Sequence, residues 1–307
     1  MKYEGQICRS PMERSAFMLP IAVGCSYNAC KFCTLFKHLK YRELSLEEIE
    51  AEILRVKSVG GNPKRIFLGD GNAFGIATEK LLTILGWIRE HFPACEGVNM
   101  DATVTDIRGK SDEELRALKE AGIDQLYIGI ETGLDDVLTF MVKDHNLAQV
   151  YEAIERIHKA GLNYDSHMMT GIAGKGRSME NAEALAKFYN ETKPKKICNF
   201  SLFLHTDSPL NKDMKSGAFV PADELENLME ARRMIELLEV EDVEYDGLHD
   251  FVGVRVRGKL PKDKEKMLAK LDAAIEEFKD KEPVYSYVCG CCGENEMYNM
   301  VDPAFRK

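Results

Sequence analysis

Three cysteines occupy nine consecutive residues near the start of the sequence, in the segment Cys25-Ser-Tyr-Asn-Ala-Cys30-Lys-Phe-Cys33. Cysteine thiolates bind zinc and iron–sulfur clusters. A [4Fe–4S] cluster normally takes four cysteines, so three would leave one iron open to an external ligand that carries an amino and a carboxylate group. Zinc would need a fourth ligand, for which His38 is the nearest candidate. The spacing therefore favours an iron–sulfur cluster over zinc or three incidental core residues.

A glycine-rich turn follows the apolar run Arg65–Leu68 and consists of Gly69, Asp70, Gly71 and Asn72. Because glycine has no side chain, the backbone N–H and C=O groups of such a turn can approach a ligand closely. Taken alone, the turn is equally consistent with an ordinary connection between a strand and a helix.

A carboxylate, Glu131, ends the run Tyr127-Ile-Gly-Ile-Glu-Thr-Gly133, at the kind of strand end where parallel sheets gather their ligand-binding residues. Ser166, His167 and Met168 lie within another apolar run and could face a filled pocket. Strand alternation allows only about half of them to point inward. His167 could also be an ordinary buried histidine with a hydrogen-bond partner.

Strand-like runs alternate with helical patterns through most of the chain. The predicted strands are Phe17–Val23, Arg65–Leu68, Gly97–Thr103, Gln125–Ile130, Leu162–Thr170 and Lys196–Leu204. The predicted helices are Ser45–Val59, Thr78–His91, Ser111–Ala121, Leu134–Ala160 with a break near Asp144, Ser178–Thr192 and Ala222–Leu238. Six βα units predict a mainly parallel sheet, either a partial barrel or a doubly wound open sheet.

The pattern changes near residue 240, so we expect residues 1–240 to form the core and residues 241–307 a C-terminal α+β extension that covers it. This extension contains a short strand at Val252–Val256, a helix from Pro261 through Phe278, and a tail with Cys289, Cys291 and Cys292. The tail cysteines could donate hydrogen from a thiol, bind a second metal, or be incidental.

Composition limits the class of protein. The chain has 307 residues, 45% of them hydrophobic, with 41 Lys plus Arg against 51 Asp plus Glu and a net charge of -10. This charge disfavours a large nucleic-acid partner. Because no apolar run is long enough to span a bilayer and the first residues do not resemble a secretory signal, we expect a cytoplasmic protein without a membrane partner.

The three cysteines, the Gly69–Asn72 turn and the Gly-Ile-Glu-Thr-Gly segment occur in the order found in the radical S-adenosylmethionine (SAM) superfamily, which the chain resembles. The segment Gly247–Pro261 and the run Phe67-Leu-Gly-Asp-Gly71 resemble a group of small radical SAM Fe–S oxidoreductases related to anaerobic coproporphyrinogen oxidase, and this resemblance covers nearly the whole chain. The family commonly separates its cysteines by three and then two residues, whereas the first gap here has four. The resemblance implies a partial (β/α)6 TIM-like barrel of the radical SAM type, an α/β fold.

The resemblance also implies the cofactors, a [4Fe–4S] cluster and SAM, and an external one-electron donor such as flavodoxin or ferredoxin. Cys25, Cys30 and Cys33 would bind the cluster. The expected SAM contacts are Phe32, Gly69, Asp70, Gly71, Asn72, Glu131, Ser166 and Met168. The reduced cluster would cleave SAM to a 5′-deoxyadenosyl radical that abstracts hydrogen from a substrate. The expected substrate-facing residues are His167, Asp246 and Cys289.

The substrate is expected to be a small molecule. The size and layout of the chain resemble the queuine lyases, which release queuine from queuosine 5′-phosphate. The amino and ring N–H groups of a 7-deazaguanine nucleotide would need a carboxylate as acceptor, and the candidates are Asp101, Asp207 and Asp246. His249 and Arg255 could also reach a substrate. The alternatives are a porphyrin-type radical SAM decarboxylase or oxidoreductase, a radical methyltransferase, and, from another class, a non-catalytic zinc-binding protein.

Overall fold

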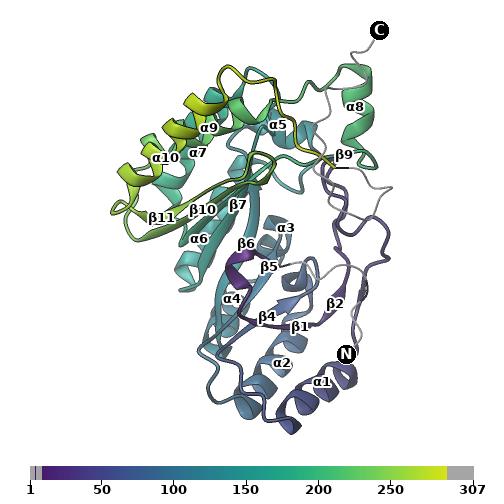
Figure 1. The fold of residues 1–307 in the computed structure, drawn as a ribbon. Coiled ribbons are helices and arrows are strands. Elements are labelled where there is room, and N and C mark those ends of the chain that lie inside the picture. Colours follow the sequence, from purple (N-terminus) through teal and green to yellow (C-terminus); the bar gives the residue numbers. More distant parts are fainter. Residues whose placement is uncertain (1–3, 5–8, 289–307) are drawn as a thin grey trace. The chain divides into compact units, whose positions relative to one another are not determined.

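The computed structural model describes Glu4 and residues 9–288, and its ribbon is drawn in Figure 1. The chain divides into two compact units. The first unit comprises Met1–Ala29, Leu35–Gly129 and Ala148–Asp165, and the second comprises Cys30–Thr34, Ile130–Leu147 and Ser166–Lys307.

Strands and helices alternate as the sequence predicts. The strands are β1 (Phe17–Pro20), β2 (Ala22–Val23), β3 (Arg42–Glu43), β4 (Arg65–Gly69), β5 (Gly97–Ala102), β6 (Ile123–Glu131), β7 (Asn163–Thr170), β8 (Lys196–Ser201), β9 (Leu204–His205), β10 (Val243–His249), β11 (Val254–Leu260) and β12 (Tyr287–Val288). The α-helices are α1 (Leu46–Ser58), α2 (Thr78–His91), α3 (Val104–Gly109), α4 (Asp112–Ala121), α5 (Asp135–Phe140), α6 (Leu147–Lys159), α7 (Ser178–Thr192), α8 (Leu210–Ser216), α9 (Glu224–Leu237) and α10 (Lys264–Phe278). Short 3₁₀ helices are η1 (Pro11–Glu13), η2 (Ala73–Gly75) and η3 (Asp250–Val252).

The main sheet has the strand order β1-β4-β5-β6-β7-β8-β10-β11. Strands β1, β4, β5 and β6 pair in parallel, as do β8 and β10, whereas β11 runs antiparallel to β10. A doubly wound sheet reverses its strand order at a switch point, but here each successive βα unit adds its strand on the same side. This order confirms the α/β prediction and favours the partial-barrel alternative.

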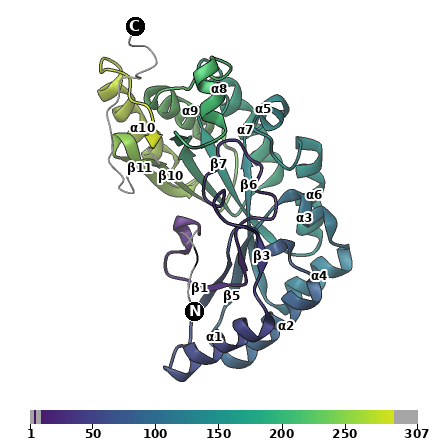
Figure 2. The ribbon, with the colours of Figure 1, turned by 90° about the vertical axis from the view of Figure 1, so that its right-hand side faces the viewer.

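The helices of the first unit begin where their sequences provide caps. Ser45 and Ser111 each accept a hydrogen bond from the backbone N–H three residues later, and the side chain of the glutamate at that position accepts one from the serine N–H, which forms two capping boxes. Gly122 ends α4 in the left-handed conformation, with φ of 117°, which glycine adopts without strain. Figure 2 shows α1 and α2 side by side in this unit.

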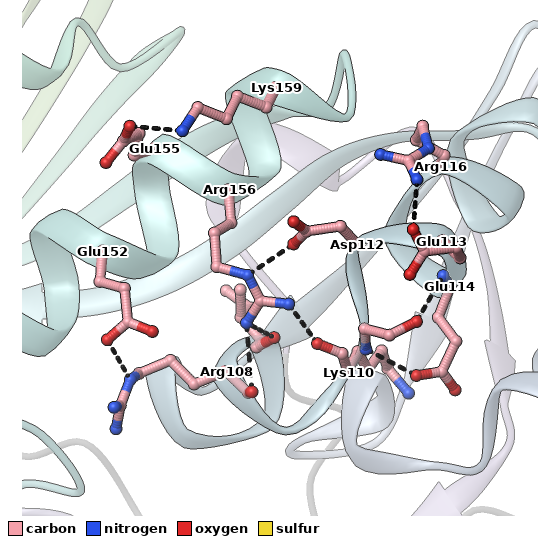
Figure 3. A network of polar contacts seen from close by, with 12 residues as sticks. Arg108, Lys110, Asp112, Glu113, Glu114, Arg116, Glu152, Glu155, Arg156 and Lys159 are labelled. Carbon is pink, nitrogen blue, oxygen red and sulfur yellow. Dashed lines mark hydrogen bonds and ion pairs between the residues drawn. The ribbon is translucent and has the colours of Figure 1, made fainter.

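A polar network fastens α6 to the turn between α3 and α4 (Figure 3). Arg156 of α6 donates from Nε to the Asp112 carboxylate at 2.7 Å and from Nη1 to the Arg108 carbonyl at 3.1 Å. Its Nη2 also donates to the Lys110 carbonyl. A planar guanidinium has five N–H donors in a fixed arrangement, so one side chain serves three acceptors at once.

In the second unit, α9 packs between α7 and α10, as Figure 1 shows. Part of the region predicted to be an extension continues the main sheet, because β10 pairs with β8. Strand β10 was missed by sequence reasoning, since Val243-Glu-Tyr-Asp-Gly-Leu-His249 mixes charges and a glycine into the strand. The sequence predicts a strand at Val252–Val256. The structure instead has β11 at Val254–Leu260, because residues 250–252 form η3.

Candidate functional site

In the first unit, the start of the cysteine loop lies against the glycine-rich turn after β4. Gly71 has φ of 52°, and a Cβ atom at this position would lie 2.2 Å from the Gly24 carbonyl oxygen and 3.0 Å from the Cys25 Cα. No side chain fits at that distance, so only glycine allows this approach. The structure therefore brings together two of the predicted site segments, Cys25 and the Gly69–Asn72 turn.

Asp70 is buried in this turn, with 7% of its surface exposed. Its backbone N–H donates to the Ala22 carbonyl at 3.2 Å, and its carboxylate accepts from the Gly71 N–H at 3.1 Å. Burial raises the pKa of Asp70 to about 6, although the Gly71 hydrogen bond opposes this shift. A buried carboxylate with one donor has lone pairs left for a cationic or N–H-bearing ligand.

Asn72 is almost fully buried and its amide group joins three segments of the first unit. Its Nδ2 donates to the Ser26 hydroxyl at 2.8 Å and to the Asp106 carboxylate, and its Oδ1 accepts from the Thr103 N–H at 3.2 Å. The side chain therefore ties the cysteine loop to the residues that follow β5. This gives Asn72 a positioning role, while direct contact with a cofactor stays a prediction.

Asp101, at the end of β5, is another acid of the first unit with a raised pKa. Burial, together with the charges of Asp70 and Glu13, raises the pKa of Asp101 well above its usual range. A neutral carboxyl group can donate a hydrogen bond as well as accept one. Sequence reasoning named Asp101 only as a substrate-facing acid, and its role stays a prediction.

In the second unit, the rest of the cysteine loop is held on both sides by backbone hydrogen bonds. The Lys31 N–H donates to the Met141 carbonyl at 3.0 Å, and the Lys31 carbonyl accepts from the Leu210 N–H at 3.0 Å. Phe32 is buried in an apolar cluster with Met141 and Ile172, against which Cys30 and Cys33 pack. The predicted adenine contact Phe32 thus presents an apolar ring close to two of the cysteines.

Glu131 forms a buried ion pair with Lys143, a residue that sequence reasoning missed. The two atoms Glu131 Oε1 and Lys143 Nζ are 3.2 Å apart, and both side chains are less than a tenth exposed. Burial by itself would lower the pKa of Lys143, but the negative charges of Glu131, Cys30 and Asp144 raise it above its ordinary value. Burial raises the pKa of the Cys30 thiol to about 11, and Lys143 opposes that shift.

The second carboxylate oxygen of Glu131, Oε2, is buried without a hydrogen-bond partner in the described part of the chain. Such a group is costly to leave unsatisfied, which indicates that a donor from a ligand completes it. Glu131 also has φ of 65°, which is strained for a residue with a side chain. An amino acid ammonium group fits this acceptor, and Lys143 would fit the accompanying carboxylate.

Strand β7 separates its predicted site residues onto two faces. Ser166 Oγ and the Tyr189 hydroxyl of α7 are 2.8 Å apart, and Ser166 and Met168 are both fully buried. His167 points to the opposite face by strand alternation, and its ring lies 5.9 Å from that of Phe200. Burial, helped by the charge of Lys143, lowers the pKa of His167 to about 4, so the imidazole is neutral at neutral pH.

The remaining predicted substrate residues lie at or after β10. Asp246 is held by two hydrogen bonds from Arg255 of the adjacent strand, from Nε at 2.9 Å and from Nη2. His249 is fully buried, with Nδ1 3.1 Å from the Ser201 hydroxyl and 3.7 Å from the Glu224 carboxylate. Cys289 and the other tail cysteines lie outside the described residues. Substrate contact by Asp246 and His167 stays a prediction.

Neither unit alone holds three His, Cys, Asp or Glu side chains close enough for an ion among the described residues. Cys25 belongs to the first unit, whereas Cys30 and Cys33 belong to the second. The assignment of all three cysteines to one cluster therefore depends on their spacing in the sequence. In the described part of the chain, no helix is long and apolar enough to cross a membrane.

Curated relatives match parts of the chain. It is 28% identical over 153 residues to the heme chaperone HemW of Bacillus subtilis (strain 168), covering 49% of this chain and 40% of that protein. It is 24% identical over 204 residues to HemW of Lactococcus lactis subsp. lactis (strain IL1403), covering 63% of this chain and 50% of that protein. The chain thus spans half or less of the length of these relatives.

Solved structures share the fold. Coproporphyrinogen III oxidase (HemN) from Escherichia coli matches 72% of this chain and 52% of its own, with a TM-score of 0.57 and 14% identity. The Radical SAM superfamily matches residues 19–189, which include the three cysteines, the Gly69–Asn72 turn and Glu131. Members of this family use a [4Fe–4S] cluster and SAM. This chain belongs to the radical SAM superfamily.

Proposed function

We propose that this protein binds SAM and a [4Fe–4S] cluster, cleaves SAM reductively, and abstracts hydrogen from a small molecule. The observation that supports this most strongly is the buried Glu131–Lys143 pair beside Cys30, with the unsatisfied Oε2 of Glu131. When bound, the reduced cluster and SAM together supply a 5′-deoxyadenosyl radical. An external one-electron donor such as flavodoxin or ferredoxin is part of this proposal, as is a cytosolic location that keeps the thiols reduced.

The residues of the chain have separate tasks in this proposal. Cys25, Cys30 and Cys33 bind the cluster as thiolates, and the positive charge of Lys143 favours the ionised form of Cys30. Glu131 accepts hydrogen bonds from the amino group of SAM, and Lys143 orients the carboxylate. Phe32 and Ile172 provide the apolar surface for the adenine ring and exclude water from the reacting atoms.

For the substrate, we propose a tetrapyrrole in preference to queuosine 5′-phosphate. The support is that two curated relatives are named heme chaperones and that a structural neighbour is coproporphyrinogen III oxidase. This favours the porphyrin-type alternative over the queuine lyase expected from size and layout. Binding without turnover, as the word chaperone implies for HemW, is an outcome that the experiments below distinguish from catalysis.

The first experiment tests the radical chemistry. Anaerobically reconstituted protein, reduced with dithionite, should contain about four iron and four sulfide per chain and release 5′-deoxyadenosine from SAM. Cys30→Ala should abolish this release, because two thiolates do not hold the cluster. Cys95→Ala, at a half-buried cysteine outside the loop, is the control and should cleave SAM normally. Zinc without iron, or normal cleavage by Cys30→Ala, would overturn the proposal.

The second experiment tests the substrate class. The same reduced protein is incubated with SAM and either coproporphyrinogen III, heme or queuosine 5′-phosphate. A tetrapyrrole substrate predicts that coproporphyrinogen III stimulates 5′-deoxyadenosine formation. Heme binding without stimulation, seen as a shift of the heme absorption band, indicates a carrier. Release of queuine would support the queuine lyase expectation and reject the tetrapyrrole.

A further inference from the structure

Two buried side chains on helices α7 and α9 bind the turns at the ends of β6 and β7. Glu230 of α9 is fully buried, and its Oε2 accepts from the Gly171 N–H at 2.8 Å, directly after β7. Its Oε1 accepts from Nδ2 of Asn181 on α7 at 2.6 Å. Asn181 is also fully buried, so both residues direct all of their polar atoms into the protein.

Asn181 extends this chain of hydrogen bonds to the turn that follows Glu131. Its Oδ1 accepts from the Thr132 hydroxyl at 2.6 Å and from the Gly133 N–H at 3.3 Å. Thr132 Oγ1 in turn accepts from the Leu134 N–H at 3.2 Å, which closes the turn. The main chain directly after the strained Glu131 is therefore fixed by Asn181 of α7.

The turns at Gly133 and Gly171 also lie in close contact with helices α7 and α9. A Cβ atom at Gly133 would lie 2.7 Å from the backbone carbon of Ala184 in α7, and one at Gly171 would lie 2.5 Å from Oδ1 of Asn227 in α9. Gly171 precedes Ile172, which packs in the same apolar cluster as Phe32. The turn held by Glu230 thus also carries one side of the proposed adenine surface.

We propose that Glu230 and Asn181 are positioning residues for SAM, which hold the Glu131 turn and the Ile172 turn in register without touching the cofactor. The inference rests on the proposed function, because it assumes that Glu131 and Ile172 contact SAM. The Gly171 N–H and the Asn181 NH₂ group both donate to Glu230, so each oxygen at residue 230 must accept a hydrogen bond. A carboxyl group can do this in either protonation state, because its hydroxyl oxygen keeps a lone pair, whereas glutamine would place an NH₂ group, which accepts nothing, against one of the donors.

The test compares Glu230→Gln with Glu224→Gln, a matched control on the same helix. Glu224 is equally buried, but its partners are Ser201, Ser286, Asn227 and His249. SAM affinity is measured by equilibrium dialysis with reconstituted protein, and thermal unfolding of both variants gives their loss of stability. We expect Glu230→Gln to weaken SAM binding about tenfold or more, the size of one lost buried hydrogen bond, and Glu224→Gln to change it less than threefold.

Hydrogen exchange of the reconstituted protein without SAM supplies a second readout. The peptides that contain Gly133 and Gly171 should exchange faster in Glu230→Gln than in the wild type, but not in Glu224→Gln. If Glu230→Gln does not fold, Thr132→Val takes its place, because it removes one donor to Asn181 with little change of shape. This variant should show a smaller loss of SAM affinity and a smaller increase in hydrogen exchange. Equal losses of SAM affinity in the two glutamate variants, or unchanged exchange at both turns, would overturn the inference.

Glu131→Gln separates this inference from the proposed function. Wild-type protein that binds no SAM shows that the proposed function is wrong. SAM binding could instead be present in the wild type, lost in Glu131→Gln, and kept in Glu230→Gln and Thr132→Val. That result would show that Glu131 belongs to the SAM site and that Glu230 and Asn181 do not position it.

Discussion

At the scale of single residues, the buried Glu131–Lys143 pair decides how a charged ligand could be held. Removing two charges from water is costly, and their mutual attraction offsets this only when the geometry is close and other hydrogen bonds complete the site. Here one carboxylate oxygen has no partner among the described residues. The pair is thus better suited to binding a ligand with both an ammonium and a carboxylate group than to stabilising the fold.

Replacing Lys143 with methionine should leave the Glu131 carboxylate buried without its cation. We expect a loss of about 3–5 kcal/mol in the free energy of unfolding and at least a hundredfold loss of SAM affinity. The double variant Lys143→Met/Glu131→Gln removes both charges, so it should recover most of the stability while SAM binding stays weak. Urea unfolding and equilibrium dialysis measure the two effects. A double variant as unstable as the single one would contradict the ion-pair interpretation.

At the scale of elements, the turns after parallel strands depend on the helices that follow them. Arg156 shows how one helical side chain fixes such a connection, since it bonds Asp112 and the carbonyls of Arg108 and Lys110 (Figure 3). Among the described residues, the turn between α3 and α4 has no strand partner that could satisfy those carbonyls. The guanidinium therefore replaces the hydrogen bonds that a regular element would supply.

Arg156→Lys should lower the free energy of unfolding by about 1 kcal/mol or more, because an ammonium group cannot reach the three acceptors in the plane of the guanidinium. The matched control is Arg116→Lys, which affects only an exposed ion pair with Glu113. The free energy of unfolding of this control should not change measurably. Urea unfolding of both variants checks the prediction, and equal stability of the two would argue against a role for the network.

The sequence predicts helices well where the apolar periodicity is regular. Helices α2 and α7 have the predicted bounds although neither has a side-chain cap, and α1 and α4 begin directly after their serine caps. Strand β10 and Lys143 could not be predicted, because neither belongs to a repeating pattern: β10 mixes charges into a strand, and Lys143 approaches Glu131 only through the turn after α5. The two glycines that flank Ile172, Gly171 and Gly174, are a signal for a turn that the sequence does offer, and both adopt positive φ in the structure.

At the scale of the whole molecule, stability should depend on pH through Glu230. Burial raises the pKa of Glu230 to about 8, although hydrogen bonds from Gly171 and Asn181 oppose the shift, whereas its ordinary value is 4.5. The folded protein thus keeps a proton that the unfolded chain loses above pH 4.5. The stabilisation from this group is fully present below pH 4.5 and is lost as the pH rises through 8.

Urea unfolding between pH 5 and pH 8 should therefore show a contribution from Glu230 that falls by up to about 1.4 kcal/mol per pH unit. Glutamine does not titrate, so the difference in unfolding free energy between wild type and Glu230→Gln should decrease over the same range. As a control, Glu226, whose charge acts on Glu230, is replaced with glutamine. This variant should keep most of the pH dependence of the unfolding free energy. Parallel curves for wild type and Glu230→Gln would contradict this prediction.

Strand β11 is the last strand in the order of the main sheet, and among the strands of the described residues it has β10 as its only neighbour there. An edge strand of this kind offers a row of backbone groups to which a second molecule could add a strand. Arg255, Arg257 and Lys259 place positive charge along it, and Lys270 donates to the Arg255 carbonyl at 2.7 Å. Asp246 pairs with Arg255 and Asp242 pairs with Lys259, so Arg257 and Lys270 carry most of the charge that would repel a second copy of the same edge. We expect this charge to disfavour the addition of another strand at β11.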